Sequence, residues 1–172
     1  GPVIDADAKA MLDAHADRMS SEGRLLCRAP LPDNPTGGFF VAPAAFEIDG
    51  IERLEREVFG PILHVIRYQQ NKLDAVIDAI NETGYGLTLG IHSRIDSVHH
   101  QICSQVRAGN AYVNRNMIGA VVGVQPFGGE GLSGTGPKAG GPRYLHRFAV
   151  ERTLSVNTTA AGGNAALMSM EA

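Results

Sequence analysis

The stretch VQPFGGEGLSGTGPKAGGP, residues 124–142, holds seven glycines and three prolines in nineteen residues. This density predicts a loop without helix or strand. Three of the glycines have the GxGxxG spacing of a dinucleotide-binding turn: Gly129, Gly131 and Gly134. That turn requires a strand directly before it and a helix directly after it, so that the helix N-terminus faces the pyrophosphate. Pro126 precedes the motif and Pro137 follows it, so neither context fits, and we reject the dinucleotide interpretation.

Other uses of so much unrestrained backbone stay open. A P-loop is excluded, because Pro137 stands where that motif needs a lysine. The loop can be a tightly packed connection, or a surface where backbone touches a ligand. In the second case Phe127 can wall an apolar pocket, and Gly119 and Ala120 can present backbone N–H groups to a carboxylate. A carboxylate held in this way, with an aliphatic chain on Phe127, would suit a small acidic substrate.

The remaining reactive side chains offer little chemistry. Cys27 lies in a predicted strand and Cys103 on the apolar side of a predicted helix, so we interpret both as buried structural thiols. They form no CxxC motif, which fits a reducing, cytoplasmic setting. His99 and His100 point about 100° apart on a helix and have no further ligand nearby, so we predict no metal site. Ser133 has no readable His-Asp partner, and we interpret it as a hydroxyl that stabilises the loop.

The composition is that of an ordinary globular protein. The chain has 172 residues, of which 44% are hydrophobic and 19% charged, and its net charge is −3. This charge carries no basic signature of nucleic-acid binding. No apolar run approaches the roughly 20 residues of a membrane span, and the residues after Gly1 do not resemble a secretory signal.

The hydrophobic pattern predicts a series of elements. Asp5 or Asp7 can cap a first helix that Gly23 ends, and two extended segments follow it. From residue 62 the pattern is regular: strand 62–68, a helix from Leu73 to near Gly84, strand 87–93, a helix from its cap Asp96 to near Gly109, and strand 110–114. A short helix is expected within residues 140–148. Residues 150–157 alternate like an edge strand, and 158–172 have little to bury, so we expect a mobile tail.

Strands that alternate with helices over short connections indicate an α/β fold with a parallel sheet. Right-handed crossovers would place the two helices between these strands, the one that starts at Leu73 and the one that starts at Asp96, on one face of that sheet. The glycine-rich loop then follows the last of these strands, on the side where α/β sheets bind ligands.

Several runs resemble a known family. LEREVFGP, YGLTLGIHSRI, AGNAYVNRN and PFGGEGLSGTGPKAGGP resemble the C-terminal part of the aldehyde dehydrogenase superfamily. The run IGAVVGVQPFGGEGLSGTGPKAGGP is similar, more narrowly, to L-glutamate γ-semialdehyde (pyrroline-5-carboxylate) dehydrogenases, and among them to the dehydrogenase module of the bifunctional proline-catabolic flavoproteins of the proline utilization A family. The resemblance covers essentially the whole chain. It implies a parallel Rossmann-like sheet, with residues 1–149 as the C-terminal part of the catalytic domain and 150–157 as an oligomerisation strand.

The resemblance also implies how the chain contacts NAD. The contacting segment is 55–61. Glu57 corresponds to the glutamate that hydrogen-bonds the nicotinamide ribose, and Phe59 to the phenylalanine that packs beside the ribose and nicotinamide. A carboxylate can accept hydrogen bonds from ribose hydroxyls, and a ring limits how far the nicotinamide swings.

A second implied site binds the substrate, glutamate semialdehyde. Gly119 and Ala120 match the loop that anchors the substrate carboxylate, within a longer anchor loop of residues 117–142. Phe127 matches the aromatic residue that contacts the aliphatic stem. This role would explain the many glycines of the loop, because glycine lets the backbone approach a ligand closely.

The catalytic groups of the family lie elsewhere. Its cysteine nucleophile and general-base glutamate, and most of its NAD domain, are expected upstream of Gly1, in the remaining part of the same enzyme. FAD would belong only to a separate proline dehydrogenase domain. The full-length protein is expected to be a cytoplasmic homo-oligomer that can associate with a membrane, and this segment to contact neither nucleic acid nor metal.

A second hypothesis is a non-catalytic module. Long bifunctional members carry an aldehyde-dehydrogenase-like domain that lacks the nucleophile and serves assembly. Such a module has no need of Glu57, Phe59, Gly119, Ala120 and Phe127 together, so their joint presence favours the enzyme portion.

Overall fold

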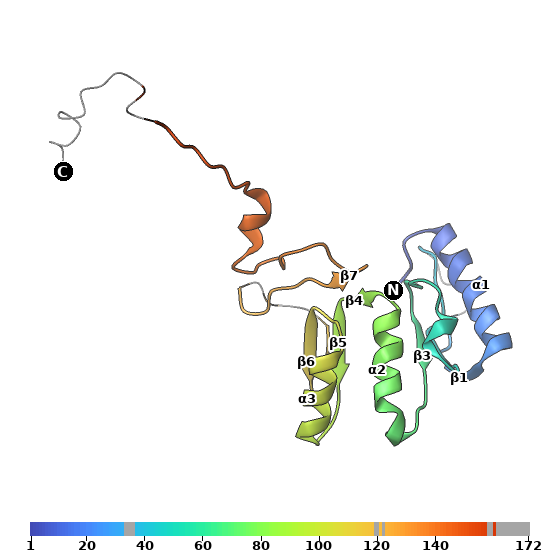
Figure 1. Ribbon diagram of the computed structural model, residues 1–172. Coiled ribbons are helices and arrows are strands. Elements are labelled where there is room, and N and C mark those ends of the chain that lie inside the picture. The colour runs from blue at the N-terminus through green and yellow to red at the C-terminus, as the bar shows by residue number, and fades with distance from the viewer. Residues whose placement is uncertain (33–36, 119–120, 122, 158–159, 161–172) are drawn as a thin grey trace.

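The computed structural model describes residues 1–32, 37–118, 121, 123–157 and 160 (Figure 1). Its helices, 3₁₀ turns (η) and strands are, in chain order, α1 (Ala6–Glu22), β1 (Arg24–Arg28), β2 (Ala44–Glu47), η1 (Ile51–Arg53), β3 (Ile62–Val65), η2 (Gln70–Lys72), α2 (Leu73–Glu82), β4 (Tyr85–Gly86), β5 (Thr88–Ile91), α3 (Asp96–Gln105), β6 (Asn110–Val113), β7 (Glu130–Gly131) and η3 (Tyr144–Phe148). Among the described residues, no helix combines the length and the apolar character needed to cross a membrane.

The first helix forms as its capping residues predict. Asp5 is the N-cap, and its carboxylate accepts the backbone N–H of Ala8 at 2.7 Å. At the other end the N–H of Gly23 donates to the carbonyl of Met19. Both ends of the helix therefore satisfy backbone groups that would otherwise have no partner within it.

Helix α1 packs on a three-stranded sheet with the order β1-β2-β3. Strand β1 runs antiparallel to β2, and β2 runs parallel to β3 with Phe46 opposite His64. The core of this region is a cluster of five buried side chains: Ala16, Met19, Ala44, Phe46 and Ile48. Burial of these apolar groups on both the helix and the sheet fixes the helix to the strands.

A second parallel pair, β5 and β6, is joined by α3 and pairs Thr88 with Asn110 at its start. Figure 1 shows α3 beside this pair at one end of the molecule, α1 at the other end, and α2 between them. Helix α3 begins at Asp96 itself, with Ile95 as N-cap, so Asp96 is not the cap that the sequence predicts. Its carboxylate instead lies 3.1 Å from His99 Nε2.

The prediction of one common sheet is wrong in its pairing. The described strands form three sheets, and β3 and β5 pair in different ones, so the described residues form no single sheet with one face for α2 and α3. The α/β class is confirmed, since β2–β3 and β5–β6 are both parallel pairs. Periodicity predicts a strand and its exposure pattern, but pairing between strands depends on long-range contacts that periodicity does not specify.

The glycine-rich loop contains a short strand that the sequence does not predict. Residues Glu130–Gly131 form β7, which runs antiparallel to β4. Gly131 adopts a left-handed φ of 57°, and Leu132 N–H donates to the Gly84 carbonyl at 2.9 Å. Glycine tolerates this φ and this close approach, so a composition that predicts no strand in fact allows one.

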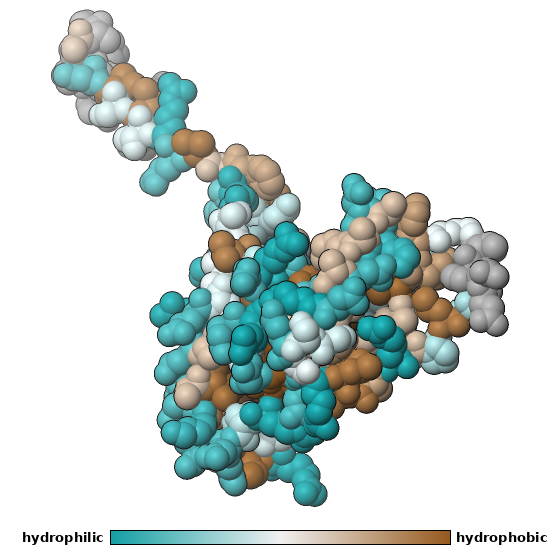
Figure 2. Space-filling model, turned by 90° about the vertical axis from the view of Figure 1, so that its right-hand side faces the viewer, coloured by the Kyte–Doolittle hydropathy of each residue, from teal (hydrophilic) through white to brown (hydrophobic). Residues whose placement is uncertain are grey.

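The C-terminal part leaves the body of the molecule after η3 (Figure 1). Figure 2 shows hydrophobic and hydrophilic residues mixed along its described part, and Val150, Leu154 and Val156 are exposed. Residues 150–157 pair with no strand in the described part of the chain, so the oligomerisation strand stays a prediction. Of the predicted mobile tail, residues 158, 159 and 161–172 lie outside the described residues.

Candidate functional site

Glu57 and Phe59 lie on the irregular segment between η1 and β3. Glu57 is exposed and lines a hollow whose other walls come from η1, the end of α2, β4, β5 and the glycine-rich loop, including Ser133. Its carboxylate has no hydrogen bond or ion pair with another described residue, so it is free to accept bonds from a ligand. The Phe59 ring is 82% exposed. The fold therefore brings Glu57 and the loop, 76 residues apart at Ser133, to one hollow.

Phe127 lies where the glycine-rich loop returns to the sheet. Its N–H donates to the Ala139 carbonyl at 3.0 Å, and the Ala139 N–H donates back at 2.8 Å. The side chain is 37% exposed, so part of the ring faces out of the loop. Gly119 and Ala120 lie outside the described residues.

The loop is fixed to the framework by Ser133. Its Oγ accepts the backbone N–H of Gly86, in β4, at 3.0 Å. This confirms the interpretation of Ser133 as a hydroxyl that stabilises the loop. Ser133 directly follows Leu132, whose N–H donates to the Gly84 carbonyl, so two successive residues hold β7 against β4.

The GxGxxG glycines pack against one another. A Cβ at Gly129 would lie 2.6 Å from Ser133 Cβ, and a Cβ at Gly134 would overlap the Gly129 carbonyl. No α-helix follows the motif in the described residues, where the next element is η3. These glycines are therefore explained by internal packing, which agrees with rejecting the dinucleotide interpretation.

Sequence reasoning missed a polar cluster at the start of β6. Asn110 is 9% exposed. Its Nδ2 donates to the Pro126 carbonyl at 3.0 Å, and its Oδ1 accepts the Gly128 N–H at 3.3 Å. Lys138 Nζ donates to the Gly109 carbonyl and lies 3.4 Å from Asn110 Oδ1. An asparagine that begins a predicted strand carries no periodic signal, so only the fold identifies this contact.

The end of β6 carries a second amide. Asn114 has a left-handed φ of 55°, which few residues other than glycine adopt. Its Nδ2 donates to the Ser93 carbonyl at 2.9 Å, and its Oδ1 accepts the Ser93 N–H at 3.0 Å. The side chain thus continues the β5–β6 pairing for one residue while the backbone turns away toward residues 115–118.

The two cysteines are not buried. Both Cys27 and Cys103 are exposed in this chain, which corrects their interpretation as buried thiols. All five residues of β1 are exposed, and no residue of α3 is fully buried. The predicted apolar face of α3 is only half-covered, so Cys103 gains no enclosure from it. Neither thiol has a described histidine or carboxylate hydrogen-bonded to it.

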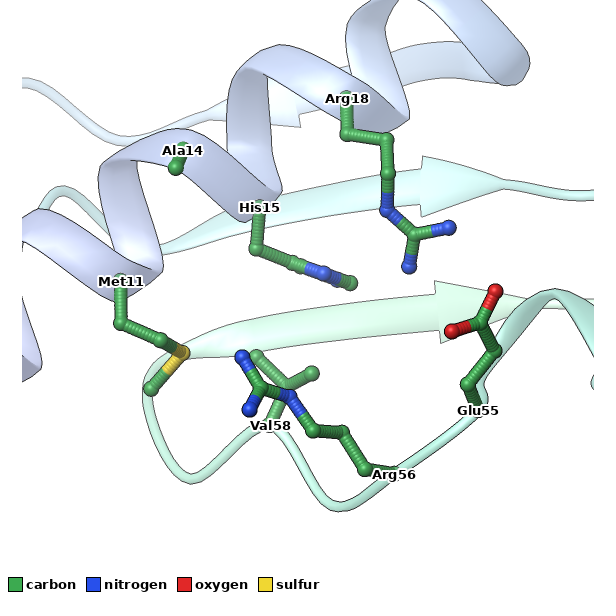
Figure 3. A pocket seen from close by; sticks show the side chains of 7 residues that line it. All are labelled: Met11, Ala14, His15, Arg18, Glu55, Arg56 and Val58. Carbon is green, nitrogen blue, oxygen red and sulfur yellow. The ribbon is translucent and has the colours of Figure 1, made fainter.

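A histidine pair lies beside a different hollow, which His15 of the pair lines (Figure 3). His15 Nε2 of α1 lies 2.9 Å from His64 Nε2 of β3, so one ring donates and the other accepts. Figure 3 shows His15 and Arg18 facing Arg56 across this hollow. Burial lowers the pKa of His15, and His64 and Arg18 lower it further; burial and Arg18 lower the pKa of His64. The neutral form of both rings is therefore favoured.

The described residues place no further metal ligand beside this pair. Within the described residues, no group of three or more histidine, cysteine or carboxylate side chains is placed to hold a metal ion. The other histidine pair, His99 and His100, has ring centroids 5.1 Å apart, and His99 contacts the carboxylate of Asp96.

Comparison with known proteins gives consistent matches. The aldehyde dehydrogenase family model matches residues 1–154. The bifunctional protein PutA of Escherichia coli is 54% identical over 157 residues, covering 88% of this chain and 12% of that protein. The 1-pyrroline-5-carboxylate dehydrogenase of Geobacillus thermodenitrificans is 36% identical over 157 residues, covering 90% of this chain and 30% of the relative. The chain thus spans a small part of these relatives.

Solved structures of related proteins show the same similarity. A crystal structure of a mutant of proline utilization A from Bradyrhizobium japonicum is 61% identical, with a TM-score of 0.84 over 93% of this chain and 16% of that one. The 1-pyrroline-5-carboxylate dehydrogenase from Thermus with bound NAD is 36% identical, with a TM-score of 0.76 over 86% of this chain and 28% of that one. The chain belongs to the aldehyde dehydrogenase family.

Proposed function

We propose that the chain is the C-terminal portion of an NAD-dependent L-glutamate γ-semialdehyde dehydrogenase that acts in proline catabolism. The observation that carries the proposal is the identity of 54% to a PutA and 36% to a 1-pyrroline-5-carboxylate dehydrogenase, both over 157 residues. The geometry supports it, because an unpaired carboxylate, Glu57, faces a hollow that the glycine-rich loop also lines.

The chain's own residues would bind and orient the two reactants. NAD, when bound, accepts a hydride from the substrate. Glu57 would accept hydrogen bonds from the nicotinamide ribose, and the exposed ring of Phe59 would limit the swing of the nicotinamide. In the substrate site, the backbone N–H groups of Gly119 and Ala120 would hold the carboxylate while Phe127 contacts the aliphatic stem. Restricting both reactants in this way lowers the entropic part of the barrier.

The nucleophilic cysteine and the general-base glutamate would come from the part of the enzyme upstream of Gly1. Among the described strands, β3 pairs only with β2, and β5 only with β6, so each has one edge open to another strand. Leu63 on β3 is 61% exposed. Open strand edges and exposed apolar side chains support docking of further polypeptide here. FAD would serve only a proline dehydrogenase domain, and the whole enzyme would act in the cytoplasm as a homo-oligomer.

The test compares NADH formation from glutamate semialdehyde by the full-length protein and by residues 1–172 alone. We expect turnover only by the full-length protein. Turnover by residues 1–172 would make Cys27 or Cys103 the nucleophile and would refute the division of roles. An inactive full-length protein with an intact fold would instead favour the non-catalytic assembly module.

The cofactor contact has its own variant. In the full-length protein, Glu57→Gln should raise the KM for NAD or lower kcat, because the amide accepts hydrogen bonds more weakly than the carboxylate. Glu55→Gln is the matched control, since Glu55 is an exposed carboxylate two residues away that lines the histidine hollow instead. Equal effects of the two variants would contradict the role of Glu57.

A further inference from the structure

The Asn110 amide holds the backbone on both sides of Phe127. Its Nδ2 donates to the carbonyl of the residue before, Pro126, at 3.0 Å. Its Oδ1 accepts the N–H of the residue after, Gly128, at 3.3 Å. One side chain at the start of β6 therefore fixes the two peptide groups that flank a single aromatic residue. A rigid strand is a firm base for such a contact, because β6 pairs with β5 along its length.

Lys138 connects this amide to the opposite side of the loop. Its Nζ donates to the Gly109 carbonyl and lies 3.4 Å from Asn110 Oδ1. The next residue, Ala139, exchanges both backbone hydrogen bonds with Phe127. Phe127 is thus held from Asn110 on one side and from the chain beginning at Lys138 on the other, and these two sides are bonded to each other.

The chemistry of the contact requires an amide. Pro126 presents an acceptor and Gly128 presents a donor, so the side chain between them must donate with one atom and accept with the other. Asparagine does both in one plane. Aspartate could accept from Gly128 and from Lys138, but its second oxygen would face the Pro126 carbonyl with no proton to donate.

Glycine at the neighbouring positions lets the two segments approach. A Cβ on Gly109 would overlap the Gly128 carbonyl, and a Cβ on Gly128 would lie 3.3 Å from Lys138 Cα. The contact at Gly109 therefore leaves no room for a side chain, and the contact at Gly128 leaves little. The cluster of Asn110, Lys138 and their glycine neighbours is therefore built as one unit.

We propose that Asn110, oriented by Lys138, is a positioning residue for the substrate: it sets the place of the Phe127 ring and hence the fit of the aliphatic stem. This inference rests on the proposed function, in which Phe127 contacts that stem. It assigns no chemical step to Asn110, which acts through Phe127 alone.

The experiment measures steady-state kinetics of the full-length enzyme carrying Asn110→Asp. We expect the KM for glutamate semialdehyde to rise about tenfold, the effect of losing one well-made hydrogen bond and gaining a repulsive contact. The KM for NAD should stay unchanged, because the cofactor contacts lie on another segment. Lys138→Met should raise this KM by less, since the contacts of Asn110 to Pro126 and Gly128 remain. Lys138→Arg, which keeps a cationic donor, should raise the KM less than Lys138→Met does.

Asn81→Asp is the matched control. The Asn81 amide also bonds two backbone groups, the Gln105 carbonyl at 2.9 Å and the Arg107 N–H at 2.8 Å, but it holds the end of α3. A generic loss of stability would affect both variants alike. Equal KM changes in Asn110→Asp and Asn81→Asp would therefore overturn the proposal.

A double-mutant cycle separates action through Phe127 from any other route. If Asn110 acts by placing the ring, Asn110→Asp should raise the KM no further in a Phe127→Ala background. Additive effects would overturn the proposal.

A fluorine resonance gives a readout that needs no activity. With 4-fluorophenylalanine incorporated and the Phe127 signal assigned by Phe127→Leu, Asn110→Asp and Lys138→Met should shift or broaden that signal, and Asn81→Asp should not. An unmoved signal overturns the positioning role. If the wild-type enzyme does not oxidise glutamate semialdehyde, the proposed function fails, and the moved or unmoved signal still decides whether Asn110 places the ring.

Discussion

The α1–β3 region and the β5–β6 region are stabilised by different forces. In the first, Leu12 and Met19 of the helix and Phe46 of the sheet are fully buried. In the second, the buried apolar side chains are fewer, chiefly Ile77, Ile91 and Tyr112. There the elements are joined by three amides that each bond two or more backbone groups: Asn81, Asn110 and Asn114.

The difference teaches how the second region can hold a glycine-rich loop. Apolar burial is strong but has no direction, so it fixes a helix on a sheet without fixing a single peptide group. An amide bonded to backbone has both direction and reach, and it can place a loop that has almost no apolar side chains to bury. The first region should therefore respond mainly to lost volume, and the second to lost donors, acceptors or glycines.

The largest effect should follow from truncation in the apolar region. Phe46→Ala removes a fully buried ring from the core cluster and should cost about 3–5 kcal/mol of local stability. Hydrogen exchange of the peptides in α1 and β2, followed by mass spectrometry of the full-length protein, measures this loss. The peptides of β6 should be protected as before. Equal deprotection of both regions would show that they are one cooperative unit.

An added methyl group should destabilise the β5–β6 region, where the glycine-rich loop packs closely. Gly109→Ala places a Cβ against the Gly128 carbonyl, which belongs to backbone and cannot rotate away. We expect a loss of about 1–3 kcal/mol confined to the loop around Phe127. Gly90→Ala is the control, because a Cβ there lies 3.4 Å from the flexible Met117 side chain. Loop peptides that exchange alike in both variants would speak against the close packing at Gly109.

Substitution of Asn114 should cost less stability, and two causes can be separated: the loss of its hydrogen bonds and the strain of its left-handed φ. Asn114→Gly removes the two bonds to Ser93 but keeps the left-handed φ, and should cost about 1–2 kcal/mol. Asn114→Ala should cost about 1 kcal/mol more, because alanine is strained at that φ. Hydrogen exchange of the β5 and β6 peptides measures both. If the alanine variant proves the more stable one, backbone strain has no role at this position.

The smallest effect is a pH dependence that belongs to the first region alone. The folded-state pKa values of His15 and His64 are lowered, so the unfolded chain binds the proton more tightly. The stability that the neutral pair contributes is complete above about pH 6.5, the pKa of a free histidine, and is lost as the pH falls through the folded-state values. The charges facing the pair, from Arg18, Glu22 and Arg56, include two cations that oppose protonation.

Exchange protection of α1, corrected for intrinsic rates, should therefore fall between pH 7 and pH 5. His64→Gln should flatten this dependence, because glutamine keeps a hydrogen-bonding group but does not titrate. His146→Gln, at an exposed histidine on η3, should leave it as in the wild type. A wild-type slope in the His64→Gln protein would mean that other groups cause the acid sensitivity.

Local signals in the sequence predict much of the fold. The Asp5 cap and Gly23 bound α1 as expected, and the alternation of apolar runs finds β3, α2, β5, α3 and β6 within a few residues. The family motifs place Glu57 and the glycine-rich loop, and the structure brings both to one hollow. The elements and the motifs are each contiguous in the sequence, so the sequence predicts them, whereas the meeting of Glu57 with Ser133, 76 residues away, comes from the fold.

The features that sequence reasoning missed depend on distant residues. The contact between His15 and His64 spans 49 positions, and that between Lys138 and Asn110 spans 28. The prediction of strand pairing fails for the same reason, since β3 and β5, which correspond to two successive predicted strands, do not pair. The exposure of Cys27 is likewise set by which strands surround β1, and β1 has β2 as its one described neighbour.

The open edges of β3 and β5 bear on the order of folding. In the proposed enzyme a strand from the upstream part would close them, so its contacts would join points far apart in the polypeptide. Contacts of high sequence separation form late, because the entropy of closing a long loop opposes them. We therefore expect the α1–β3 region and the β5–β6 region to form first, and their union to be the slow step. Until that step the two edges can accept a wrong strand, so misassembly should be concentrated along the line between β3 and β5.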